Sequence, residues 1–279
     1  MAVISFWSGG EKPVGQTLSI ASVATHMAIE HNYRCLLINA TYNDDTLERC
    51  FWKINPKSIS KIVNQGKVDI GSGPEGLISA VASNKATPEI VPSFTKVLLK
   101  NRLDVLIGLK TEIYEEYEKS LMLYKDLINT ANHYYDLVFV DLPKSLKKDT
   151  TKALLGSSNM IVYCIPQNVK LINQYLQELQ QNQELLKPEI LIPLLTCSDE
   201  NSKHNVRNVA RYIGEGSTML KVPYSAALKD SAGEASVAKF ILGTRVSKAS
   251  LNQNLDFIDS VNLVCNRLIK KLQELQYRI

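Results

Sequence analysis

Short, almost continuous apolar runs alternate along this chain with longer stretches of helical periodicity. Each run is bounded by turn residues or by a helical stretch. Runs of this kind are typical of parallel strands, because helices cover both faces of a parallel sheet. The pattern predicts strands over residues 2–7, 34–39, 136–141, 159–165, 190–196 and 219–222.

Leucines and tyrosines recur at helical spacing between these runs. They predict helices over residues 17–30, 114–133, 169–186 and 251–275, whereas residues 66–76, with four of the thirteen glycines, predict a loop. Strand–helix alternation predicts right-handed crossovers and an α/β fold: a doubly wound, mainly parallel β-sheet with helices on both faces. No shift in composition marks a boundary, so we expect one domain over residues 1–279, ending in an amphipathic helix at about 251–278.

The composition narrows the class of protein. Hydrophobic residues make up 45% of the chain and charged residues 22%, which excludes wholesale disorder. No run reaches the roughly 20 apolar residues of a membrane helix, and the apolar N-terminus is too short for a signal peptide. The formal net charge of +4 permits an anionic partner without indicating one.

Cysteine and histidine are scattered. The five cysteines form no CxxC pair, so we expect reduced thiols in a cytoplasmic protein, without a disulfide framework or a zinc site. Cys35, Cys164 and Cys197 fall in apolar, strand-like runs, where cysteine behaves as a small hydrophobe. The four histidines are isolated and are predicted to lie at the surface or at helix ends: His26, His31, His133 and His204.

A glycine-bearing loop follows the first predicted strand and leads into a helix. Gly10 and Gly15 have the spacing of the P-loop pattern GxxxxGK[ST], and Thr17 matches its hydroxyl residue, but Gln16 stands at the lysine position. Backbone N–H groups in such a loop converge on an anion, and the helix N-terminus adds partial positive charge. The sequence therefore indicates a phosphate-binding loop; the alternative is a plain strand–helix connection that binds no nucleotide.

This opening resembles the deviant Walker A motif KGGxGK[ST] of the MinD/ParA group of P-loop ATPases. In register, Glu11 occupies the signature-lysine position, Lys12 and Pro13 replace two glycines, and Gly15 and Thr17 match. Two further segments agree in order and spacing: CLLINATY at 35–42 resembles VLLIDADP, and YDLVFVDLPKS at 135–145 resembles DYVIIDxPPS. The layout of residues 103–145 is similar to that of the CpaE/TadZ branch, whose members position pili and secretion machinery.

The resemblance implies a site for ATP or ADP with Mg²⁺. Thr17 would bind the metal and Asp141 would hold it through water. Asn39 and Thr41 replace the family's two second-strand acids. The nucleotide-binding positions it implies are Gly10, Glu11, Lys12, Val14, Gly15, Gln16, Thr17 and Leu18.

The signature lysine, the Walker lysine and the two second-strand acids of the family are all replaced in this chain, which changes the expected activity. Phosphoryl transfer depends on positioning and charge stabilisation, so we expect weak nucleotide binding and weak or absent ATP hydrolysis. Lys12 is a candidate substitute for the signature lysine, and Asp44 or Asp45 for the lost acids. The resemblance thus implies a degenerate, homodimeric localisation or scaffolding factor for a pilus, secretion or division system.

Two other functions stay open. One is a DNA-segregation protein that binds DNA non-specifically, for which Lys144, Lys147 and Lys148 are candidate contacts, although they equally fit a solvated helix start. The other is a ligand-free protein-interaction module.

Residues 262–279 have the basic amphipathic pattern of helices that lie on a membrane surface. The alternative for this segment is a helix packed on the sheet with its lysines solvated.

Overall fold

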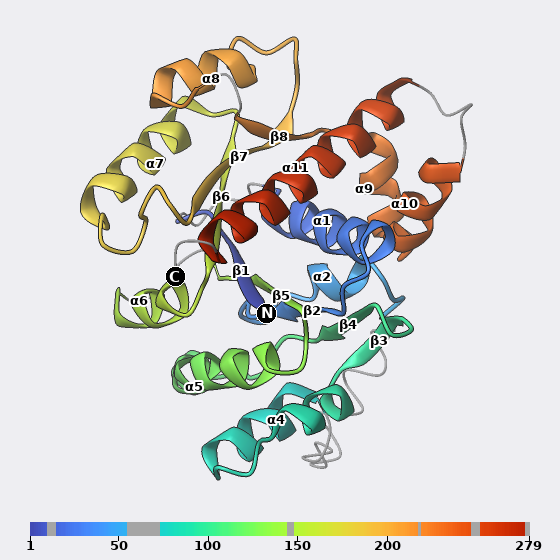
Figure 1. Cartoon of the computed structure of the whole chain (residues 1–279), viewed down its shortest axis with the longest axis vertical. Coiled ribbons are helices and arrows are strands. Elements are labelled where there is room, and N and C mark those ends of the chain that lie inside the picture. Colours follow the sequence, from blue (N-terminus) through green and yellow to red (C-terminus); the bar gives the residue numbers. More distant parts are fainter. Residues whose placement is uncertain (10–14, 55–72, 144–147, 217–218, 247–251, 277–279) are drawn as a thin grey trace.

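An eight-stranded sheet runs through the computed structural model of the chain (Figure 1). The structure describes residues 1–9, 15–54, 73–143, 148–216, 219–246 and 252–276. The strand order is β3-β4-β2-β5-β1-β6-β7-β8. The strands are β1 (Ala2–Trp7), β2 (Cys35–Asn39), β3 (Lys96–Leu99), β4 (Leu103–Leu106), β5 (Leu137–Asp141), β6 (Met160–Pro166), β7 (Leu191–Ser198) and β8 (Leu220–Pro223).

Every strand pair is parallel except β3 with β4 at one edge. The six strands predicted from apolar runs are confirmed to within two residues at their ends. The pattern does not predict β3, because this edge strand is short and exposes Lys96 and Val97, nor the four-residue β4. Even so, the mainly parallel α/β architecture is confirmed.

Helices cover both faces of the sheet and bury a separate apolar cluster on each (Figure 1). On one face lie α1 (Gln16–Glu30), α2 (Thr46–Arg49), α9 (Ala226–Gly233), α10 (Val237–Val246) and α11 (Asn252–Gln276). On the other lie α4 (Gly73–Ala82), the 3-10 helix η1 (Pro88–Phe94), α5 (Tyr114–Asn132), α6 (Lys148–Gly156), α7 (Val169–Gln181) and α8 (Val206–Ile213).

Two predicted boundaries are wrong. The predicted loop over 66–76 is helical from Gly73, because Pro74 suits a first helical turn; residues 66–72 lie outside the described part of the chain. The helix predicted over 169–186 ends at Gln181. Asn182 leaves helical geometry there, and its carbonyl accepts turn hydrogen bonds from Leu185 and Leu186 ahead of Pro188.

Tertiary packing also overturns two placements of single residues. Cys197 is exposed and has a positive φ of 48°, at an irregularity in the β7–β8 register, so it is not a buried strand residue. His26 is only 4% exposed, because α11 packs across α1 and brings Asn262 to 3.4 Å from the imidazole. All five cysteines are free thiols, and the other four are buried.

Helix α11 turns most of its apolar residues into the protein. Val264, Leu268 and Leu272 are buried against α1 and β8, whereas Leu263 is 60% exposed. Lys271, predicted to be solvated, donates from Nζ to the carbonyls of Pro188 and Leu191 at 2.8 Å each. These contacts support the packed alternative for residues 262–276. In the described part of the chain, no helix combines the length and apolarity that crossing a membrane requires.

The packing of α11 can be tested by truncating one buried and one exposed side chain of that helix. Phe257 is fully buried, so we expect Phe257→Ala to lower the free energy of unfolding by about 4 kcal/mol in urea titrations. Leu263→Ala should change it by less than about 0.5 kcal/mol. Similar losses in the two variants would contradict the observed docking of the helix.

Candidate functional site

Three strand ends meet in one row at the carboxyl edge of the sheet. Asp141 at the end of β5 pairs with Phe6 of β1 on one side and with Asn39 of β2 on the other. Loops that follow parallel strands emerge at the same edge, where ligands bind in open α/β sheets. The structure therefore brings together the three segments from which the sequence predicts the site.

The two ends of the predicted phosphate loop are held in left-handed backbone conformations. Gly9 has φ 64° and Gly15 has φ 73°, values that glycine adopts without steric cost. The Gly9 carbonyl accepts a hydrogen bond of 2.8 Å from Gln174 Nε2. A Cβ on Gly15 would lie 2.5 Å from Cys197 Sγ, so a side chain there would have to displace this thiol.

Only part of the predicted nucleotide-binding set falls in the described residues. Gly10, Glu11, Lys12 and Val14 lie outside them, as do Lys144 and Lys147. Thr17 and Leu18 are half-buried in the first turn of α1. The described part of the predicted site therefore consists of Gly15, Gln16, Thr17 and Leu18 together with the two strand ends.

Gln16 does not extend toward solvent. Its side chain is 2% exposed, and Nε2 donates to Asp141 Oδ1 and to the Leu142 carbonyl, at 2.7 Å each. The residue at the Walker-lysine position therefore binds the end of β5. The residue expected to hold a metal through water accepts this hydrogen bond instead.

Asn39 organises the turn after β2. It is fully buried, and its Oδ1 accepts from Thr41 N at 2.9 Å and from Thr41 Oγ1 at 2.6 Å. Its Nδ2 donates to the Asp44 carbonyl at 2.8 Å and to both oxygens of Glu48 at 3.0 Å. Asn39 is therefore a buried polar group at the end of β2, and its amide faces an acid.

The acid that contacts Asn39 is absent from the predicted site. Glu48 is 6% exposed, and Oε1 also accepts from the Gly108 N–H at 2.6 Å. A Cβ at Gly108 would lie 2.9 Å from Asn39 Nδ2, so glycine permits this approach. Glu48 belongs to a four-residue helix without a recognisable motif. Its role is visible only in the structure, where the Gly108 N–H, from the segment after β4, donates to its carboxylate.

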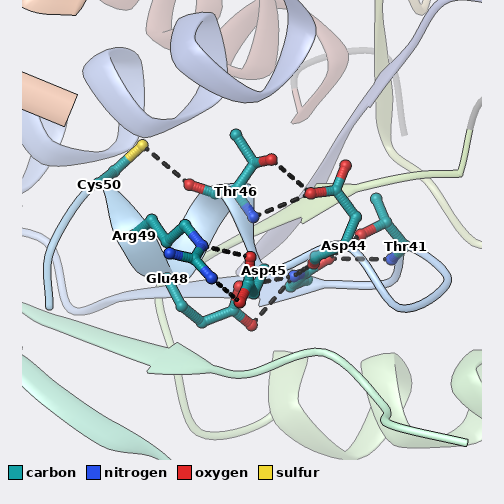
Figure 2. A network of polar contacts seen from close by, with 8 residues as sticks. Thr41, Asp44, Asp45, Thr46, Glu48, Arg49 and Cys50 are labelled. Atoms are coloured by element: carbon teal, nitrogen blue, oxygen red, sulfur yellow. Dashed lines mark hydrogen bonds and ion pairs between the residues drawn. The ribbon is translucent and has the colours of Figure 1, made fainter. Parts of the chain in front are cut away.

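The two aspartates considered as substitutes for the lost acids bind the adjoining helix α2 (Figure 2). The Asp44 carboxylate accepts from the backbone N–H and the hydroxyl of Thr46. Asp45 forms an ion pair with Arg49, with Nε 2.6 Å from Oδ1. Both carboxylates therefore stabilise the turn into α2. A cavity of about 290 Å³ lies beside them and reaches Glu48 and Gly108.

The negative charge of Asp141 contributes to the raised pKa values of two buried thiols. Burial, and then the negative charge of Asp141, raise the pKa of Cys50 to about 12. The same two causes raise the pKa of Cys164 well above its ordinary value, so both thiols stay protonated at neutral pH. In the described residues, no cluster of three or more His, Cys, Asp or Glu side chains could hold a metal ion.

The Asn39–Glu48 pair predicts that restoring the family's acid harms the fold. Asn39→Asp would place two carboxylates against each other in a buried site, so we expect a loss of about 3 kcal/mol in unfolding free energy. Glu48→Gln should also destabilise, because two amide donors then meet. The double variant Asn39→Asp/Glu48→Gln should recover part of the loss; strictly additive losses would contradict the contact.

Gly15 and Gly214 provide a matched pair for testing the close approach of the loop. Both have a positive φ, but nothing lies within 4 Å of a Cβ at Gly214. We expect Gly214→Ala to cost about 1 kcal/mol and Gly15→Ala about 3 kcal/mol in urea unfolding, because the methyl group added at position 15 would also overlap Cys197. Equal costs would show that Cys197 does not constrain Gly15.

Comparisons with known proteins point to one fold. No protein-family model matches the chain, and no curated protein sequence matches it. Among solved structures, a ParA family ATPase from Chlorobium tepidum has a TM-score of 0.70 at 16% identity, over 93% of this chain and 96% of that one. The MinD protein of Pyrococcus horikoshii complexed with Mg-ADP has a TM-score of 0.66 at 14% identity, over 97% and 98%.

A third similar structure is the MinC:MinD cell division complex of Aquifex aeolicus. Its TM-score is 0.64 at 14% identity, over 97% of this chain and 96% of that one. The similarity extends along nearly the whole of each chain. The chain therefore has the fold of the MinD/ParA-type P-loop ATPases.

Proposed function

We propose that this chain is a degenerate MinD/ParA-like localisation or scaffolding factor with weak nucleotide binding and little or no ATP hydrolysis. The observation that carries the proposal is the side chain at the Walker-lysine position. Gln16 is neutral, buried and bonded to Asp141 and Leu142. It therefore supplies no positive charge to the phosphates of a bound nucleotide.

The second-strand residues lead to the same conclusion. Asn39 cannot act as a base, and its amide and the Thr41 hydroxyl are engaged with each other. Glu48 is buried, and its carboxylate accepts from the Asn39 amide. Because phosphoryl transfer depends on charge stabilisation and on a positioned water, these substitutions remove most of the expected rate enhancement.

The proposed ligand and partners rest on the similarity of the fold to the MinD/ParA-type ATPases. A nucleotide, ATP or ADP, would bind through the backbone of the loop and the N-terminus of α1, in one P-loop domain spanning residues 1–279. The structural neighbours complexed with Mg-ADP and with MinC support a nucleotide and a protein partner. We propose a cytoplasmic homodimer near the CpaE/TadZ-like branch that serves a pilus, secretion or division system, with at most weak membrane contact through residues 262–279.

Steady-state turnover with Mg-ATP tests the proposed loss of hydrolysis. We expect turnover at least about 100-fold below 1 s⁻¹, the lower end of ordinary enzymes, because the lysine and the acids are missing. Gln16→Lys should tighten Mg-ATP binding in calorimetry without restoring turnover, since Asn39 and Thr41 are unchanged.

Turnover of the unaltered protein above about 1 s⁻¹ would refute the proposal. Salt-sensitive retention of duplex DNA in a mobility-shift assay would favour the DNA-segregation alternative. The absence of any thermal shift with ATP or ADP would favour the ligand-free interaction module.

A further inference from the structure

A cavity of about 330 Å³ lies at the edge of the sheet opposite to the candidate site. Its lining includes Leu191 and Leu220, the first residues of β7 and β8. Asp141 is the last residue of β5, and the neighbours β5, β1, β6, β7 and β8 all pair in parallel. The cavity is therefore formed at the amino ends of the strands, away from the edge where Asp141 lies.

Helices α7 and α11, which cover opposite faces of the sheet, both border this cavity. Its volume is at the lower end of the roughly 300–1,000 Å³ of pockets that hold small molecules. Such pockets have mainly apolar walls and a few polar groups that orient the ligand. The apolar wall here includes Tyr175, Leu179, Leu186, Leu191, Met219 and Leu220. This wall suits the apolar body of a small ligand.

Two cations of α11 line the cavity together. Arg267 and Lys271 are four residues apart, so their like charges lie on one face of the helix. Lys271 Nζ donates to the carbonyls of Pro188 and Leu191 at 2.8 Å each, which fixes the ammonium group at the wall. Burial, and then the charge of Arg267, lower the pKa of Lys271. Within the described residues, no carboxylate forms an ion pair with either cation.

The described lining contains one acid, Glu215, against these two cations. The acids Glu189 and Glu274 line a neighbouring cavity of about 260 Å³, which shares Arg267 and Lys271. The side chains that line the larger cavity therefore carry one positive charge in excess. A ligand with a single negative charge balances this excess.

We propose that this cavity binds a small monoanion with an apolar body, of the class of medium-chain carboxylic acids. An ammonium group has three donors, and the two carbonyls use two of them, so Lys271 has one N–H left for a carboxylate. The guanidinium of Arg267 supplies further donors in the geometry that carboxylates accept. The alkyl chain lies along Leu179 and Met219. The ligand thereby bridges α7 and α11, independently of any nucleotide.

Methionine-methyl NMR locates the ligand, with octanoate as the probe. The chain has five methionines, and Met219 lines the cavity, whereas Met122 is exposed on α5. Octanoate should shift the methyl resonance of Met219, assigned with Met219→Leu, and leave that of Met122 unchanged. An unchanged Met219 resonance at about 10 mM octanoate would overturn the proposal, because a ligand of this size that fits its pocket binds more tightly than that.

The role of charge is tested by comparing octanoate with octanamide, its neutral analogue, in the same titration. Octanoate should bind at least about tenfold more tightly, because its hydrogen bonds are charge-assisted. Arg267→Gln should weaken octanoate by about fivefold or more and leave octanamide within about twofold. Lys270→Gln is the matched control, since Lys270 is exposed on the same helix and absent from the described lining; it should change octanoate affinity by less than about twofold.

A filled cavity tests the apolar wall. Leu179 is half-buried, so Leu179→Trp places a larger side chain in the cavity and should weaken both probes while the circular dichroism spectrum stays unchanged. Equal affinity for octanoate and octanamide would overturn recognition of an anion. Equal losses in Arg267→Gln and Lys270→Gln would assign the attraction to the general charge of α11 and would also overturn the proposal. None of these outcomes depends on ATP turnover, so they leave the proposed function to its own test.

Discussion

The position of β5 between β1 and β2 is the constraint on which the site depends. Parallel pairing on both sides places Phe6, Asp141 and Asn39 in one row, although they lie far apart in the sequence. The loop after β1 and the turn after β2 both begin beside this row. The first turn of α1 therefore places Gln16 within hydrogen-bond distance of Asp141. The turn after β2 leads into α2, which places Glu48 within hydrogen-bond distance of Asn39.

Two buried carboxylates on this edge accept hydrogen bonds from neutral donors. Asp141 accepts from the Gln16 amide, and Glu48 accepts from the Asn39 amide and the Gly108 N–H. A buried carboxylate needs hydrogen-bond donors, since desolvation penalises its charged form. At both places an amide stands where the MinD/ParA pattern has a charged residue. The substitutions therefore belong to a hydrogen-bonded local structure in which the two amides are required.

Much of this arrangement is readable from the sequence. Apolar runs such as residues 2–7 and 136–141 can be recognised without knowledge of their partners, because strands covered on both faces are apolar at nearly every position. The glycine spacing and the order of the three motifs likewise indicate which strand ends belong together. The apolar runs are local features and suffice to predict the parallel sheet, whereas the expectation that the three motifs form one site comes from their resemblance to the MinD/ParA group.

Contacts between distant segments decided the rest. His26 is buried because α11 crosses α1, and Cys197 is exposed because β7 is irregular where it approaches Gly15. Glu48 belongs to the site because the Gly108 N–H, from the segment after β4, donates to its carboxylate. Gln16 is held in place because its amide donates to Asp141. A residue's type shows which hydrogen bonds it can make. Which of them forms is set by the partner that folding brings within about 3 Å.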